Sequence, residues 1–176
     1  MIPVAQDGSK TYGQAMSDQE LPACGLYRTT REVAGVPEGR LVYFHNHGDP
    51  GPGIYLPSGW KGNRATWEER GHTLPDPNDG SGLETVTAEG FYRVTEAFHC
   101  CEKHCRLFES EFLVQLGYNG SAEPILFTPE IADGVFGIPE RGTRIDHDRI
   151  AKLSPLKVAM RKDSAPQEGP SNGILH

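Results

Sequence analysis

Residues 25–30 read GLYRTT, and residues 90–95 read GFYRVT. A second pair of segments, Leu41–Pro57 and Leu113–Pro129, carries Leu, Val, Gly and two Pro at the same relative positions. The tripeptide Glu-Arg-Gly at residues 69–71 also returns further along the chain. The three pairs keep their order at offsets of 65, 72 and 71 residues, which indicates a duplicated unit of roughly 70 residues.

The chain has 176 residues, of which 21 are Gly and 14 are Pro, a content that favours short strands and turns over long helices. We predict a mainly β fold, an antiparallel barrel or two-sheet sandwich built from two pseudo-twofold repeats; an α+β arrangement is the alternative. The two repeats, 23–89 and 90–162, are expected to share one core in a single domain spanning 23–162. Polar composition predicts a flexible N-terminal segment over 1–22 and a disordered tail over 163–176.

The predicted second strand of the first repeat, 40–46, has one apolar face, since Val42 and Phe44 alternate along it. Val and Leu stand at the matching positions of the second repeat. The opposite face becomes polar toward the following turn, where it ends in His45 and His47. We therefore expect these two imidazoles at the rim of the fold, within reach of solvent or a ligand.

The local structure of two later segments of the first repeat is predicted from their sequences. Residues 63–71 resemble a short helix that begins at Asn63 as N-cap and stops at Gly71. The stretch from Pro75 to Gly82 is predicted to be a plain loop.

The charge and the apolar pattern exclude two classes of partner. The formal net charge is −7, so the surface is expected to repel phosphate backbones, and nucleic acid is not expected as a partner. No stretch approaches the roughly 20 apolar residues of a membrane span. The chain also shows no export signal, so its four Cys are expected to be free thiols or metal ligands in a cytoplasmic protein.

The strongest chemical cluster is FHCCEKHC at residues 98–105, which lies in a stretch seven residues longer than its counterpart in the first repeat. Thiolates and imidazoles are ligands that zinc prefers. We predict a zinc site formed by Cys100, Cys101, His104 and Cys105; a helical conformation would place the last three on one face. His99 and the distant Cys24 are the alternatives to Cys100 as the fourth ligand.

Two other interpretations of this cluster remain open. Cysteines are frequently buried as small apolar side chains. A redox or nucleophilic thiol is also conceivable, because neighbouring basic side chains such as His99 and Lys103 lower a thiol pKa.

A second constellation is His45-Asn46-His47-Gly48-Asp49. Together with His72, the residues His45, His47 and Asp49 are predicted to bind a ligand, since two His at alternate strand positions project from one face. The stretch 39–47 has a Gly, then five residues, then His-Asn-His. This spacing resembles the start of the first motif of the cupin family. A Gly/Pro-rich stretch stands where that motif carries a Glu. The resemblance implies a small double-stranded β-barrel that often binds a metal.

Two functions follow as hypotheses. The first is a non-enzymatic module that binds a protein or a small ligand and carries a zinc-binding Cys/His insertion. The second is a small metal-dependent enzyme of cupin-like barrel type in which His45 and His47 hold the metal. A homodimer is a further expectation, because β folds often associate through strand edges or exposed faces.

Overall fold

The computed structural model describes residues 21–159, and short antiparallel strands make up most of this part. The predicted flexible segments, 1–22 and 163–176, lie outside the described residues apart from positions 21 and 22. The fold is mainly β, as expected, and the α+β alternative is not needed. Within residues 21–159 the helical elements are two short 3-10 turns, η1 (Pro77–Gly82) and η2 (His147–Lys152).

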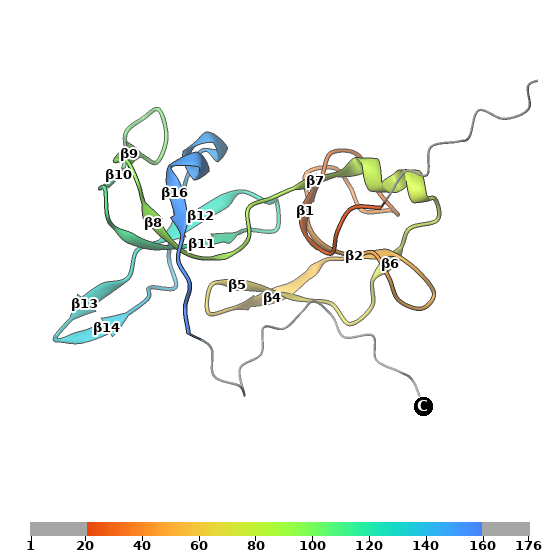
Figure 1. Cartoon of the computed structure of the whole chain (residues 1–176), viewed down its shortest axis with the longest axis horizontal. Coiled ribbons are helices and arrows are strands. Elements are labelled where there is room, and N and C mark those ends of the chain that lie inside the picture. Colours follow the sequence, from red (N-terminus) through yellow and green to blue (C-terminus); the bar gives the residue numbers. More distant parts are fainter. Residues whose placement is uncertain (1–20, 160–176) are drawn as a thin grey trace, which may run out of the picture.

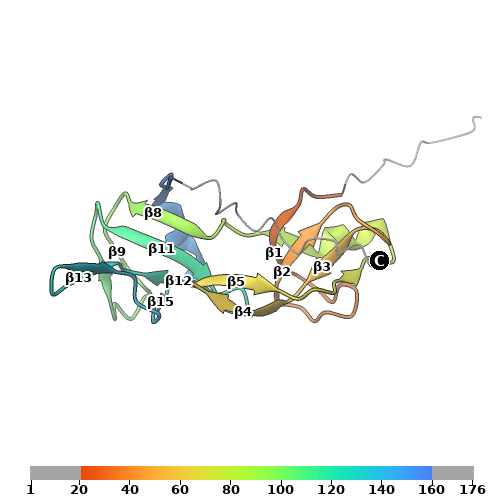
Figure 2. The ribbon, with the colours of Figure 1, turned by 90° about the horizontal axis from the view of Figure 1, so that it is seen from below.

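Two five-stranded antiparallel sheets form the framework, and Figures 1 and 2 show them at opposite ends of the molecule. The first sheet has the order β6-β3-β2-β1-β7, and the second has the order β15-β12-β11-β8-β16. The strands of the first sheet are β1 (Gly25–Thr29), β2 (Leu41–His45), β3 (Gly53–Tyr55), β6 (His72–Thr73) and β7 (Leu83–Thr85). Those of the second are β8 (Gly90–Val94), β11 (Leu113–Tyr118), β12 (Pro124–Phe127), β15 (Thr143–Arg144) and β16 (Leu153–Pro155).

Each five-stranded sheet is open, so the prediction of a closed barrel is wrong. In the first sheet the edge strands β6 and β7 do not pair with each other, and neither do β15 and β16 in the second. The outer strands have only two or three residues each, which leaves few backbone groups to close a cylinder.

The expected apolar faces of the central strands are confirmed. Val42 and Phe44 of β2, and Val114 and Leu116 of β11, are fully buried. Side chains at alternate positions point to one side of a strand, so each pair anchors one face of its sheet. Buried residues gather in two clusters, one beneath each sheet.

Leu41 joins the two parts of the molecule. It belongs to β2 of the first sheet, yet its side chain is buried in the cluster of the second. Its backbone N–H also donates to the carbonyl oxygen of Gly120, at 3.0 Å, in the turn after β11.

A hairpin from the first half of the chain packs on the second sheet. Its strands are β4 (Pro57–Lys61) and β5 (Arg64–Trp67), so the helix predicted over 63–71 is wrong. The buried Gln115 of β11 donates to the carbonyl oxygen of Gly62 at 2.9 Å and accepts from the Asn63 amide at 3.1 Å. These contacts with a distant strand stabilise an extended hairpin over a local helix.

A second hairpin, β13 (Glu130–Ala132) and β14 (Val135–Gly137), follows β12 as β4–β5 follows β3. Figure 1 shows it reaching away from both sheets. Every residue of its two strands is exposed. The last hairpin, β9 (Phe98–His99) and β10 (Leu107–Phe108), carries the Cys/His cluster in its loop.

Candidate metal sites

The segment 100–105, here called the thiol loop, joins β9 to β10 and is not helical. The pairing of His99 with Leu107 continues to Cys100, whose N–H donates to the carbonyl oxygen of Arg106 at 2.9 Å. The loop then turns back at His104, which has a positive φ of 54° and donates its N–H to the Cys101 carbonyl oxygen.

This turn gathers three sulfur atoms. The Sγ atoms of Cys100, Cys101 and Cys105 all lie within 4.8 Å of one another. Cys101 Sγ is 3.6 Å from Cys100 Sγ and 3.8 Å from Cys105 Sγ. Cys100 is buried, Cys101 is half-buried and Cys105 is exposed. The three free thiols could therefore hold a metal ion that enters from the solvent side.

Two thiols of the thiol loop, Cys101 and Cys105, have pKa values shifted in opposite directions. The backbone N–H of Cys105, then the Cys100 side chain and the backbone N–H of Lys103, lower the pKa of Cys101 below its ordinary value. The pKa of Cys105 is raised, first because its thiol is hydrogen-bonded to Cys101. Donors directed at one sulfur stabilise its thiolate, so Cys101 is the thiol of this pair that ionises first.

His104, the other predicted ligand of this cluster, stacks on a neighbouring ring. The His99 and His104 ring centroids are 4.1 Å apart and the planes differ by 9°. His104 is not one of the three residues whose ligand atoms converge, and its role as a fourth ligand stays a prediction.

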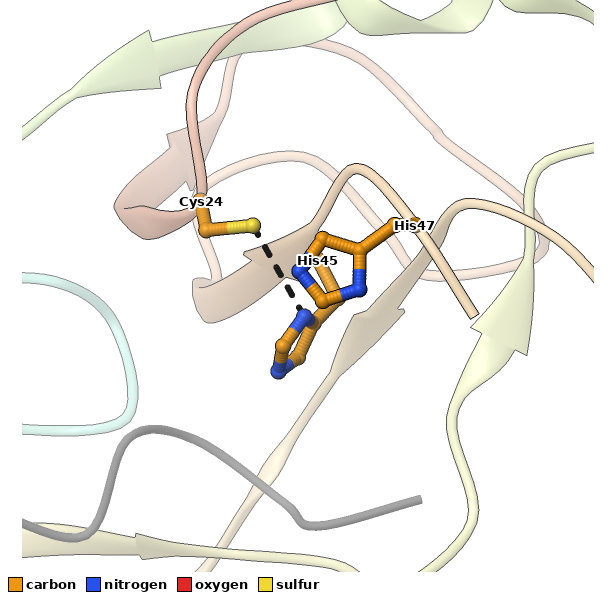
Figure 3. Close-up of side chains that lie close together, drawn as sticks. All are labelled: Cys24, His45 and His47. Carbon is orange, nitrogen blue, oxygen red and sulfur yellow. Dashed lines mark hydrogen bonds between the residues drawn. The ribbon is translucent and has the colours of Figure 1, made fainter. Parts of the chain in front are cut away.

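A second group, here called the rim cluster, consists of Cys24, His45 and His47. One ligand atom from each lies within 4.8 Å of the other two, and Figure 3 shows the Cys24 sulfur directed at the two adjacent imidazole rings. Cys24 Sγ is 3.7 Å from His45 Nδ1, and the two imidazole centroids are 4.7 Å apart. Cys24 and His45 are half-buried, and His47 is exposed.

The strand register explains why Cys24 joins the two histidines. β1 and β2 are antiparallel, with Gly25 opposite Phe44, so the preceding residue, Cys24, comes to lie beside His45. The sequence pattern pairs His45 with His47 and offers Cys24 only as an alternative ligand of the thiol loop. The antiparallel pairing of β1 with β2, which a local pattern does not specify, is the signal that could have found it.

The other predicted ligand-binding residues lie outside the rim cluster. His72 is in β6 opposite Ile54. Asp49 lines a cavity of about 240 Å³ together with Tyr55, Glu69 and Arg70. Neither residue shares a metal-binding group with His45 and His47.

A larger cavity, of about 700 Å³, has no counterpart in the sequence predictions. It is lined by residues of both halves, including Arg28, Glu84, Tyr92 and His147. These polar groups are distant in sequence, and they come to one space only in the folded chain, where residues of β7, η2 and β16 line the same cavity.

No protein-family model matches the sequence, and searches of curated proteins and of solved structures returned no significant match. Within residues 21–159 there is no helix long and apolar enough to cross a membrane.

Proposed function

We propose that the chain is a non-enzymatic protein-binding module in which a zinc ion stabilises the thiol loop. The observation that carries the proposal is the apolar, exposed β13–β14 hairpin. Ile131, Val135 and Phe136 are 73%, 68% and 58% exposed. Beside them, Phe112, Leu113 and Pro129 line a shallow cavity of about 230 Å³ with Ile131 and Phe136. Contiguous apolar surface of this kind is typical of interaction sites.

The partner we propose is a second copy of this chain. An isolated two-stranded hairpin is marginally stable in water, and the corresponding β4–β5 hairpin is covered by a sheet of the same chain. The β13–β14 hairpin carries Glu130 and Asp133 and no basic residue, whereas β4–β5 carries Lys61 and Arg64 and no acidic residue. The exposed parts of β4–β5 include Trp60. The two hairpins are therefore complementary in charge, and both present apolar surface.

The molar mass in solution tests this partner. We expect the full chain to form a dimer by light scattering coupled to size-exclusion chromatography, and the Ile131→Ser, Phe136→Ser double variant to be a monomer. Val158→Ser is the matched control, because Val158 is equally apolar and 58% exposed but lies beyond β16. A wild-type monomer at all concentrations, or a double variant that still dimerises, would contradict the proposal.

The spacing of the sulfur atoms supports zinc in the thiol loop. With Zn–S bonds of about 2.3 Å, two thiolates at adjacent corners of a tetrahedron are about 3.8 Å apart. The Cys100–Cys101 and Cys101–Cys105 distances of 3.6 and 3.8 Å match this value. The thiolate-stabilising N–H groups around Cys101 add the outer contacts that orient a metal ligand.

Metal analysis of the purified protein tests the zinc site. We expect the Cys101→Ser, Cys105→Ser double variant to lose one equivalent of zinc relative to the wild type, because two of its three thiolates are gone. Ser81→Ala, a substitution on η1 in the first half, serves as the control and leaves the zinc content unchanged. Equal zinc in the wild type and the double variant would contradict the assignment.

The second candidate function is the metal-dependent enzyme of cupin-like type. The observation in its favour is that His45 and His47 lie together with a third donor, Cys24. Catalytic zinc sites have three protein ligands and an open position. This function also needs a general acid or base. The candidates are the carboxylates of Asp49 and Glu69, which line a cavity that contains no member of the rim cluster.

The duplication of the chain and its cytoplasmic location are further parts of the proposal. Two observations support the duplication: the shared strand order of the two sheets, and the Tyr27 and Tyr92 hydroxyls, each of which donates at 2.7 Å to the carbonyl oxygen four residues earlier. All four Cys are free thiols, which supports a reducing compartment.

A further inference from the structure

We propose that Cys24, His45 and His47 form a second zinc site, separate from the thiol loop, with its fourth coordination position open to water or an exogenous ligand. The site does not depend on zinc in the thiol loop. It is the ligand set that the enzyme hypothesis requires, and it is equally compatible with a non-enzymatic module that binds an anionic or imidazole-containing ligand through the metal.

The donor distances fit zinc. With Zn–S of about 2.3 Å and Zn–N of about 2.0–2.1 Å, sulfur and nitrogen at adjacent corners of a tetrahedron are about 3.6 Å apart. Cys24 Sγ and His45 Nδ1 are 3.7 Å apart. Since His47 is exposed and its ligand atom lies within 4.8 Å of both, a small side-chain rotation completes the set.

The contacts of Cys24 hold its sulfur beside the end of β2. The backbone N–H of Asn46 donates to Cys24 Sγ at 3.3 Å, and the Cys24 thiol donates to Asn46 Oδ1 at 3.1 Å. The Asn46 side-chain amide donates to the Pro22 carbonyl oxygen at 3.3 Å, which holds the segment before β1 against the end of β2. Such outer contacts orient the ligands of metal sites.

The first histidine of the site is held by aromatic neighbours. The His45 ring centroid is 5.4 Å from that of Tyr43 and 6.1 Å from that of Tyr55. His47 follows β2 and faces solvent. A half-buried pair of ligands with one exposed ligand gives the ion a route of entry and a side on which a fourth ligand can bind.

The two clusters differ in the ions they favour. Both ligand sets suit zinc, but three thiolates also select the softer Cu(I), whereas two imidazoles also suit borderline ions such as Ni²⁺. In the rim cluster, Cys24 is also held by the Asn46 contacts and His45 by its aromatic neighbours.

Cobalt(II) is the probe for the rim cluster, since it occupies tetrahedral zinc sites and reports a thiolate ligand by charge-transfer absorption. The experiment uses the full chain with the Cys101→Ser, Cys105→Ser substitutions, which removes the thiol loop as a source of signal. We expect this protein to bind one equivalent of cobalt with a thiolate charge-transfer band and a spectrum typical of tetrahedral coordination. Zinc added afterwards should displace the cobalt.

Three further substitutions in that background identify the ligands. Cys24→Ser should abolish the charge-transfer band, and His47→Ala should weaken cobalt binding by more than about tenfold. His72→Ala is the matched control, because His72 lies in the same sheet but outside the rim cluster, and it should leave binding unchanged.

The result that would overturn the inference is an absence of cobalt binding in the thiol-loop double variant, or a charge-transfer band that survives Cys24→Ser. The reciprocal protein, Cys24→Ser with His47→Ala, separates this outcome from failure of the thiol-loop proposal. It retains only the thiol-loop zinc, so zinc analysis tests each site alone.

Discussion

Cys101 differs from its neighbours in the thiol loop because backbone N–H groups are directed at its sulfur. The Cys105 and Lys103 amides and the Cys100 thiol lower its pKa, whereas the pKa of Cys105 is raised by its interaction with Cys101. Cys101 is therefore the thiol of this pair that ionises first as the pH rises.

We expect Cys101 to be alkylated by iodoacetamide faster than Cys105 in metal-free protein. Its rate should rise with pH through a midpoint below that of Cys105, because the thiolate is the nucleophile and the pKa of Cys101 is lowered while that of Cys105 is raised. Mass spectrometry of the modified peptides measures both rates, and the buried Cys100 serves as the unreactive internal control. Equal rates with the same pH midpoint for Cys101 and Cys105 would refute this assignment.

At the scale of elements, the β4–β5 hairpin depends on a glycine in β11. A Cβ added at Gly117 would come 2.5 Å from the carbonyl oxygen of Asn63, a backbone atom that a side-chain rotation does not move. The close approach allows Trp60 Nε1 to donate to the Tyr118 carbonyl oxygen at 2.7 Å and Gln115 to bond with the hairpin turn.

Gly117→Ala is expected to reduce the free energy of unfolding by about 1–3 kcal/mol, the usual cost of overpacking a close contact. Chemical denaturation followed by tryptophan fluorescence measures the change. Gly137→Ala in β14 is the matched control, because a Cβ there meets no heavy atom within 4 Å. Equal free energies of unfolding for Gly117→Ala and Gly137→Ala would show that the hairpin does not need the close contact between β11 and the Asn63 backbone.

At the scale of the whole molecule, two buried clusters are joined at a few points, of which Leu41 is one. Phe44 of the same strand packs in the cluster of the first sheet, while Leu41 packs in that of the second. A change at Phe44 therefore acts within one cluster, and a change at Leu41 acts on the junction.

We expect Leu41→Ala to cost about 2–5 kcal/mol and Phe44→Ala about 3–5 kcal/mol. Only Leu41→Ala should also separate the unfolding of the two halves, since it removes contact between β2 and the second cluster. Hydrogen exchange measured at intermediate denaturant concentrations reports the two sheets individually. If both sheets of the Leu41→Ala variant lost hydrogen-exchange protection at the same denaturant concentration, this role of Leu41 would be contradicted.

The sequence by itself determined the features that depend on local pattern. Alternation placed Val42 and Phe44 on a buried face, because side chains of a strand point to opposite sides. The same alternation placed His45 and His47 together near the end of β2. The grouping of three Cys could also be predicted, since Cys100, Cys101 and Cys105 are close in sequence and any tight turn brings them together.

Tertiary structure decided the features that depend on partners distant in sequence. Residues 63–71 have the end signals of a helix, but 64–67 form β5, because Gln115 and Gly117 of a distant strand hold the hairpin. Cys24 joins the rim cluster through the register of β1 against β2, which no local pattern specifies. The short edge strands leave both sheets open rather than closed into a barrel. In each case the deciding contact joins segments whose approach is set by packing, and local propensity is too weak to oppose it.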